Sequence, residues 1–152
     1  MKICLVASRG GHVDELCFAK SLNGESFLIT EESGNAVEVC DTVYYVEHIN
    51  RREWNATWKI IKLFWRAADI LRKEQPDCFI STGALISVPV LILGKLSGKK
   101  IVFIESLARV ETPSISGRIA YLFADLFIVY WKSLLKFYPN ARYVDLFSED
   151  FE

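Results

Sequence analysis

The stretch KICLVASRGGH, residues 2–12, is an apolar run that passes directly into a glycine loop. A short continuous apolar run favours a strand buried on both faces over a half-exposed one. Similar runs recur at 26–30, 42–46, 77–80, 100–104 and 126–129, and helical patterns occur at 12–22, 57–73, 84–96 and 114–124. Strands that alternate with helices require crossover connections. The sequence therefore predicts an α/β fold with a doubly wound, mostly parallel, Rossmann-like sheet.

The size and charge of the chain limit its organisation. With 152 residues, 51% of them hydrophobic, it can bury one continuous core. We expect a single domain over residues 1–147 and an acidic tail over 148–152. Because the 18 basic and 19 acidic residues nearly cancel, the overall charge gives no reason to expect a nucleic-acid partner. Pro89 predicts either a kink in the helix over 84–96 or a later start for it.

The cysteines and the apolar segments indicate the cellular location of the protein. Cys4, Cys17, Cys40 and Cys78 show no C-x-x-C spacing and the histidines are not clustered, so we expect buried, reduced thiols and no metal site. We also expect no cofactor. The N-terminus has no signal-peptide layout, and the longest apolar stretch, 84–93, is about half the length that spans a bilayer. We therefore expect a cytoplasmic protein, peripheral at the inner face of the cell membrane.

The ligand site is expected at the carboxyl edge of the sheet, where loops diverge and helix N-termini present free N–H groups. Three predicted strands end there in polar or glycine-containing loops. The candidate substrate-binding residues in these loops are Arg9, Gly10, Gly11, Ser81, Thr82, Gly83 and Ser106. Neither the dinucleotide motif G-x-G-x-x-G nor the P-loop motif is present. A tight turn that binds no ligand is the alternative for Gly10 and Gly11.

His12 and Glu105 are the candidate catalytic residues. An imidazole at the start of a helix can act as a general base near neutral pH, although a capping or merely exposed histidine is the alternative. Glu105 directly follows a predicted strand, where its carboxylate could orient a sugar hydroxyl or a side chain of a partner. The alternative for Glu105 is a solvated charge or an ion pair with Arg109.

The helix predicted over 57–73 combines cations with aromatic side chains. Its polar residues recur every three or four positions and are Lys59, Lys62, Arg66, Asp69 and Lys73. Its aromatic residues, with one just before it, are Trp54, Trp58, Phe64 and Trp65. Tryptophan beside lysine and arginine suits the headgroup region of an anionic membrane. We expect Trp54, Trp58, Lys59, Lys62, Trp65 and Arg66 to dock on a membrane surface. The alternative is an ordinary amphipathic helix packed on the sheet.

Several motifs together resemble one known family. They are ASRGGH at 7–12, STGA at 81–84, ESLARV at 105–110, SISG at 114–117 and ADLFIV at 124–129. The family is that of the membrane-anchoring subunit of the dolichol-linked UDP-GlcNAc transferase, whose bacterial members are the PssD/CpsF-type proteins of exopolysaccharide and capsule synthesis. The resemblance covers about residues 2–147. The chain departs from the eukaryotic members because it lacks an N-terminal transmembrane anchor, which favours a bacterial-type protein.

The resemblance implies a split GT-B glycosyltransferase, distantly similar to MurG, that is inactive as a single chain. This chain would supply the N-terminal, acceptor-side domain, and a small PssE/CpsG-type subunit would bind the nucleotide sugar. The acceptor would be a polyprenyl-diphosphate-linked saccharide. By the same resemblance, Gly10, Gly11 and His12 face the interdomain cleft and Glu105 matches the acidic residue of the acceptor-side motif. The length agrees, because a complete GT-B enzyme needs about twice this chain.

Two other functions fit parts of the sequence. A non-catalytic activator or scaffold would stabilise a catalytic partner and place it at the membrane. A free-standing nucleotide-binding Rossmann protein would explain the fold, but the missing dinucleotide motif argues against it. The donor sugar stays open among UDP-GlcNAc, UDP-glucose and UDP-galactose, since its recognition would lie on the partner.

Overall fold

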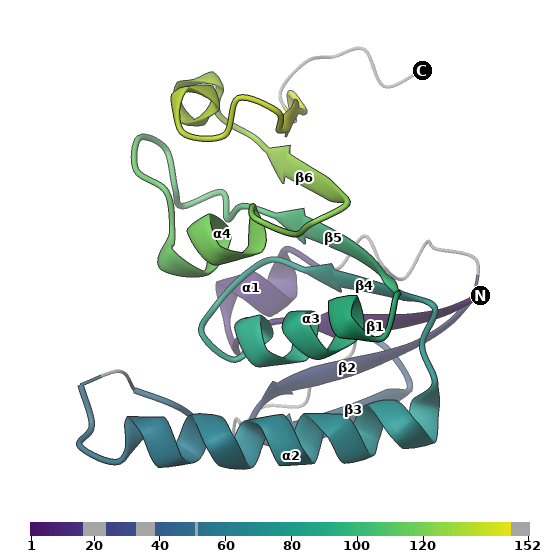
Figure 1. Cartoon of the computed structure of the whole chain (residues 1–152). Coiled ribbons are helices and arrows are strands. Elements are labelled where there is room, and N and C mark those ends of the chain that lie inside the picture. The colour runs from purple at the N-terminus through teal and green to yellow at the C-terminus, as the bar shows by residue number, and fades with distance from the viewer. Residues whose placement is uncertain (17–23, 33–38, 51, 147–152) are drawn as a thin grey trace.

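One parallel sheet forms the centre of the protein (Figure 1). The computed structural model describes residues 1–16, 24–32, 39–50 and 52–146. Within them the strand order is β3-β2-β1-β4-β5-β6-β7. The strands are β1 (Lys2–Val6), β2 (Glu25–Glu31), β3 (Thr42–Val46), β4 (Cys78–Ser81), β5 (Lys100–Ile104), β6 (Leu126–Val129) and β7 (Arg142–Tyr143). The order reverses between β1 and β4, and such a switch point is where open α/β sheets bind ligands.

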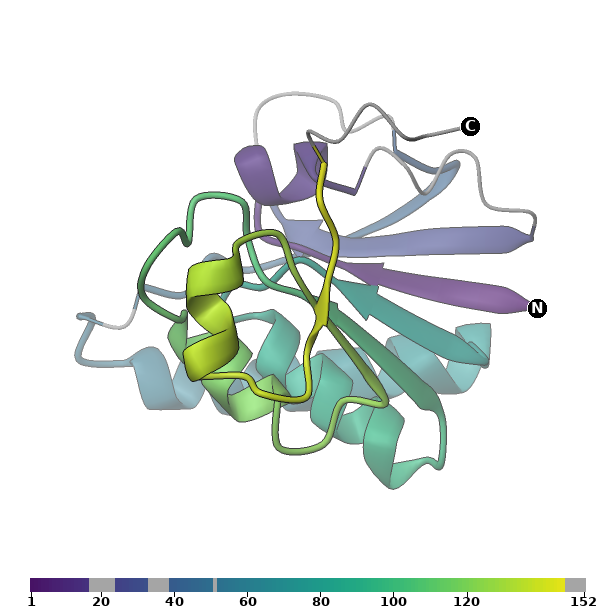
Figure 2. The same cartoon turned by 90° about the horizontal axis from the view of Figure 1, so that it is seen from above.

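The helices cover the two faces unequally. They are α1 (Gly11–Asp14), α2 (Ala56–Glu74), α3 (Ser87–Leu96), α4 (Ile115–Ala120) and the short 3₁₀ helix η2 (Lys132–Lys136). Figure 2 shows α2, α3 and α4 on one face of the sheet and α1 on the other. The predicted doubly wound, Rossmann-like fold is therefore confirmed. No helix within the described residues is both long enough and apolar enough to cross a membrane.

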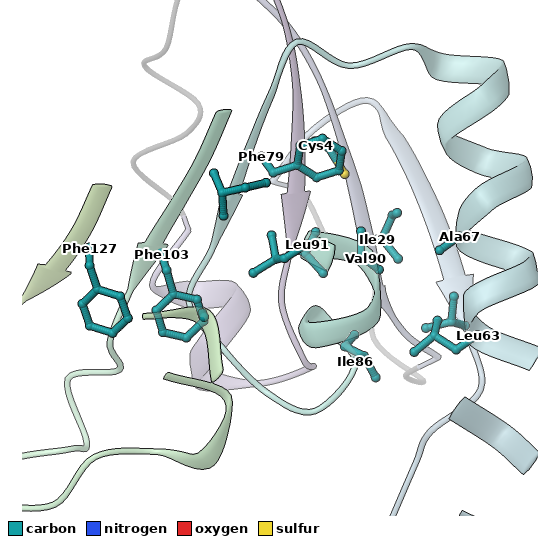
Figure 3. Close-up of a cluster of buried hydrophobic side chains, with 14 of the residues drawn as sticks. Cys4, Ile29, Leu63, Ala67, Phe79, Ile86, Val90, Leu91, Phe103 and Phe127 are labelled. Atoms are coloured by element: carbon teal, nitrogen blue, oxygen red, sulfur yellow. The ribbon is translucent and has the colours of Figure 1, made fainter. Parts of the chain in front are cut away.

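The larger part of the core lies between the sheet and α2 and α3 (Figure 3). α2 contributes Leu63, Ala67 and Ile70, whose spacing of four and three residues places them on one side of the helix. α3 packs so closely that a Cβ on Gly94 would lie 2.7 Å from the ring of Phe79. A smaller cluster on the opposite face includes Leu5 and Leu16.

Asp125, within the predicted ADLFIV motif, joins two strands at the amino edge of the sheet. Its Oδ2 atom accepts a hydrogen bond from the Ile101 amide at 2.9 Å and lies 3.0 Å from Lys95 Nζ. The Ile101 amide first and then Lys95 hold the pKa of Asp125 below its usual range, because both favour the charged carboxylate. This aspartate therefore aligns β5 with the start of β6.

Several sequence-based boundaries need correction. The helix predicted over 84–96 begins at Ser87, so Pro89 lies in its first turn, where a missing N–H removes no helical hydrogen bond. The helix predicted over 114–124 ends at Ala120, and β7 and η2 were not predicted. Cys4 is buried, but the free thiols of Cys40 and Cys78 are only half-buried. Cys17, most of the helix predicted over 12–22 and the acidic tail lie outside the described residues.

Candidate functional site

Three loops meet around a pocket at the carboxyl edge of the sheet, beside the switch point. They follow β1, β4 and β5, as the sequence predicted. The pocket has a volume of about 290 Å³. Its lining residues are His12, Ala84, Leu85, Ser106, Arg109, Pro113, Ser114, Ile115 and Ser116. The wall is mixed, since hydroxyl groups, an imidazole and a guanidinium stand beside aliphatic side chains.

The glycine loop after β1 is tied to the loop after β4. Gly10 has φ +77°, a conformation that side chains rarely tolerate, and it directly precedes α1. The Thr82 hydroxyl donates a hydrogen bond to the backbone oxygen of His12 at 2.6 Å. Gly83, at φ +110°, lies so close that an added Cβ would be 3.7 Å from His12 Cε1. The imidazole is thus packed against the second loop.

The predicted substrate-binding residues divide into three groups. Ser106 lines the pocket, whereas Arg9, Gly10 and Gly11 are exposed on the adjoining loop and do not line it. Ser81 and Thr82 are fully buried and act within the protein. The Ser81 hydroxyl accepts a hydrogen bond from the Gly83 amide at 3.0 Å. These two buried residues therefore hold the loops beside the pocket in place from inside the protein. A direct role in binding stays a prediction.

Glu105 is buried, with 1% of its surface exposed, so the alternatives of a solvated charge or a surface ion pair with Arg109 do not apply. Its Oε2 atom accepts hydrogen bonds from the Tyr138 hydroxyl at 2.8 Å and the Ser114 amide at 3.1 Å. Its Oε1 atom accepts a longer one from the Ser106 amide at 3.3 Å. Glu105 does not line the pocket, and its predicted catalytic role stays untested.

The start of α4 lies so close to Glu105 that Gly117 has no space for a side chain. Ser114 caps α4, because its hydroxyl accepts a hydrogen bond from the Gly117 amide at 2.8 Å. A Cβ on Gly117 would collide with the Glu105 carboxylate and would lie 2.7 Å from the Tyr138 hydroxyl. The motif SISG at 114–117 thus encloses the carboxylate.

Sequence analysis missed Glu15, which joins α1 to the loop after β5. Its Oε1 atom accepts hydrogen bonds from the Ser106 hydroxyl at 2.9 Å and the Leu107 amide at 3.3 Å. From the other side, the Trp131 indole donates to the Leu107 backbone oxygen at 2.8 Å. The position of Glu15, three residues after His12, was the available signal, because residues at this spacing share a helix face.

The second histidine belongs to another cluster at the same edge. Glu31, at the end of β2, is 3% exposed. One carboxylate oxygen accepts a hydrogen bond from the Ser8 hydroxyl at 2.6 Å, and the other lies 2.9 Å from His48 Nδ1. This carboxylate links the carboxyl ends of β1, β2 and β3.

The outer face of α2 and the segment just before the helix carry exposed aromatic residues. Trp54, Trp58 and Trp65 are 96%, 60% and 69% exposed. Trp58 and Trp65 lie roughly opposite the buried Leu63 and Ala67, so they do not pack on the sheet. The helix itself does pack on the sheet, as the alternative of an ordinary amphipathic helix requires. The helix keeps a separate apolar side for the core.

Of the cations predicted for docking, Lys62 and Arg66 are exposed, but Lys59 is held elsewhere. Lys59 Nζ lies 2.6 Å from Glu53 and 3.1 Å from Glu47, and these carboxylates raise the pKa of Lys59. The expectation that Lys59 is free to meet a membrane therefore needs correction. Lys59, Lys62 and Arg66 border a cavity of about 220 Å³ between β3 and α2. No cluster of three metal-ligating side chains occurs in the part of the chain that the structure describes.

The fold resembles solved proteins of the GT-B type. *Acinetobacter baumannii* MurG superposes with a TM-score of 0.69 at 17% identity, over 84% of this chain and 40% of that one. UDP-GlcNAc 2-epimerase of *Methanocaldococcus jannaschii* gives a TM-score of 0.67 at 11% identity, over 90% of this chain and 41% of that one. This chain therefore spans about two fifths of either structure. The fold and its edge pocket define a Rossmann-like domain equivalent to one half of a GT-B protein.

Sequence relatives identify the family. Residues 11–147 match the family described as "Oligosaccharide biosynthesis protein Alg14 like". The *Homo sapiens* protein named UDP-N-acetylglucosamine transferase subunit ALG14 is 30% identical over 95% of this chain and 82% of its own length. The *Rattus norvegicus* protein of the same name is 30% identical over 93% of this chain and 81% of its own length. The chain belongs to the Alg14-like family. These relatives are eukaryotic and do not support the bacterial PssD/CpsF-type assignment or a role in capsule or exopolysaccharide synthesis.

Tyr138 provides a test of the buried Glu105 cluster. Burial first and the Glu105 charge second raise the pKa of Tyr138 well above its usual value of about 10. Because the folded pKa is raised, the stability that this hydroxyl contributes is complete below the unfolded pKa and is lost as pH rises toward the folded one. We expect Tyr138→Phe to lower the free energy of unfolding by about 1–3 kcal/mol at pH 7. Measured by urea denaturation, the difference in the free energy of unfolding between Tyr138→Phe and wild type should shrink above a pH of about 10. A difference that grows there would contradict the assignment, and Tyr45→Phe at an exposed tyrosine is the control.

Proposed function

We propose that this chain is the acceptor-side subunit of a two-chain, inverting glycosyltransferase. In this proposal a second chain binds UDP-GlcNAc, and this chain binds a polyprenyl-diphosphate-linked saccharide. The observation that carries the proposal is the pocket at the switch point, with an imidazole in its wall, in a domain equivalent to half of a GT-B protein. Membership of a family whose curated relatives are named transferase subunits supports it. The PssE/CpsG type of partner has no such support.

His12 is the proposed general base. An acceptor hydroxyl in the pocket would transfer its proton to the imidazole as its oxygen forms a bond to the anomeric carbon of the donor sugar. The bond from that carbon to the UDP oxygen would break in the same step, and the electron pair would leave with UDP. One direct displacement inverts the configuration. Charge on the leaving diphosphate would be stabilised by amides and a helix N-terminus of the partner.

Glu105 is better suited to positioning than to proton transfer. Its two oxygens already accept three hydrogen bonds, and α4 lies over it. Through the Ser114 and Ser106 amides, the carboxylate would hold two lining residues of the pocket at their positions. The ASRGGH loop and the Glu105 segment would thus contribute differently: the first supplies the reacting imidazole and the second supplies the wall.

The outer face of α2 is the proposed membrane-docking surface, on the cytoplasmic side. Trp58 and Trp65 provide aromatic surface for the headgroup region, and Lys62 and Arg66 provide charge that attracts anionic lipids. Neither of these two cations forms an ion pair among the described residues, in contrast to Lys59. Docking would keep the subunit beside its lipid-linked acceptor.

Reconstitution tests the two-chain enzyme. This chain, a candidate partner and their mixture would be assayed with UDP-GlcNAc, UDP-glucose and UDP-galactose and a polyprenyl-diphosphate-linked acceptor. We expect transfer from UDP-GlcNAc by the mixture only. Full activity from the partner alone would instead show a non-catalytic activator or scaffold, and activity from this chain alone would refute the half-enzyme.

Replacement of His12 tests the general base. We expect His12→Ala to lower kcat of the reconstituted pair about a hundredfold or more, because proton transfer would lose its acceptor. His48→Ala, at the other histidine, is the matched control and should have a much smaller effect. Activity of His12→Ala within about threefold of wild type would exclude the role, since a general base contributes far more than that.

Vesicle binding tests the docking surface. We expect the double variant Lys62→Glu/Arg66→Glu to lose most binding to vesicles that contain anionic lipid, because like charges repel. The control is Lys132→Glu/Lys136→Glu, which reverses two exposed lysines at the same spacing on η2. Sedimentation would measure the bound fraction. Equal loss in both variants would indicate a net-charge effect, and no loss in the first would rule out this surface.

A further inference from the structure

Two polar atoms, one on α1 and one on the residue that directly follows it, are buried without a hydrogen-bond partner in the described part of the protein. They are His12 Nδ1 and Glu15 Oε2. Such atoms are uncommon in folded proteins, because an unsatisfied polar group loses its bonds to water without replacement. The two residues are three positions apart and therefore lie on the same side of the helical turn. An imidazole N–H donates and a carboxylate oxygen accepts, so the pair is chemically complementary.

Contacts on both residues restrict where these atoms can lie. Glu15 is anchored through its other oxygen, which accepts from the Ser106 hydroxyl and the Leu107 amide. The backbone oxygen of His12 accepts from the Thr82 hydroxyl, and the edge of its ring lies against Gly83. The two unpaired atoms are not in direct ion-pair contact. One water molecule between them would satisfy both, because a bridging water both donates and accepts.

We propose that Glu15 is a positioning residue for His12, joined to it through one bridging water. The water accepts from Nδ1–H and donates to Glu15 Oε2, which fixes the proton on Nδ1. The Nε2 atom then carries the free lone pair. If His12 is the base of the proposed function, on which this step rests, Nε2 takes the proton of the acceptor hydroxyl and the Glu15 charge stabilises the imidazolium.

The tautomer can be measured on the full chain without a partner or substrate. Imidazole ¹⁵N NMR, at a pH where the rings are neutral, would report which nitrogen of each histidine carries the proton. We expect Nδ1–H for His12 in the wild type. In Glu15→Gln we expect a shift toward Nε2–H, because the glutamine amide presents a donor to the water. The glutamine carbonyl can still accept from Ser106 and Leu107, so the loop is retained.

Two controls accompany this measurement. His48, whose Nδ1 faces Glu31, gives a second signal in the same spectrum that should not change. Asp14→Asn changes an exposed carboxylate on the same helix and should leave His12 unaffected. An Nε2–H tautomer in the wild type, or the same tautomer in Glu15→Gln and wild type, would overturn the proposal.

Kinetics of the reconstituted pair separate this inference from the proposed function. We expect Glu15→Gln to lower kcat at least about tenfold, because an incorrect tautomer removes the base. The KM for the acceptor should stay within about twofold. A wild-type pair with no transfer would refute the proposed function, while the NMR result would still decide the role of Glu15. An unchanged kcat in an active pair would overturn the catalytic consequence of the positioning.

Discussion

The buried carboxylate of Glu105 fixes the carboxyl edge of the sheet. An ionised carboxylate away from water is costly unless hydrogen bonds replace its hydration. Here donors come from its own loop, from the start of α4 and from Tyr138, which lies 33 residues further along the chain. Since all must converge on one side chain, the loop after β5, α4 and the segment after β6 cannot shift independently. The pocket wall that contains Ser106 and Ser114 depends on this convergence.

This constraint explains the structural role of some residues in the motifs that carry the family resemblance. Gly117 has no space for a side chain beside Glu105, and Asp125 aligns two strands at the opposite edge. Both belong to the motifs that carry the resemblance, yet neither lies in the pocket. Other motif residues line the pocket, namely His12, Ala84, Ser106, Arg109, Ser114, Ile115 and Ser116. The motifs therefore combine residues that hold the scaffold together with residues that form the pocket wall.

Most of the sheet could be predicted because its strands are continuous apolar runs ended by glycine or polar loops. β3, β5 and β6 have the predicted bounds. β7 was missed because two residues, Arg142 and Tyr143, carry no periodic pattern. The convergence of loops followed from the parallel topology, but the roles of Glu15 and Tyr138 did not. Their partners lie tens of residues away, and such contacts depend on packing that a single sequence does not encode locally.

The tryptophans of α2 show what a hydrophobic pattern can and cannot decide. Leu63, Ala67 and Ile70 already satisfy the requirement for a core-facing side, so Trp58 and Trp65 are left on the outer side at a cost in solvent-exposed apolar area. α2 runs back across the sheet after β3, and its first turn therefore lies toward the carboxyl edge, the end at which the pocket opens (Figure 1). This arrangement would suit a lipid-linked acceptor. A membrane surface bound along α2 would hold the lipid at the same end of the domain as the His12 imidazole. The crossover that the fold requires would thus place the proposed docking surface and the proposed chemistry at the same end of the domain.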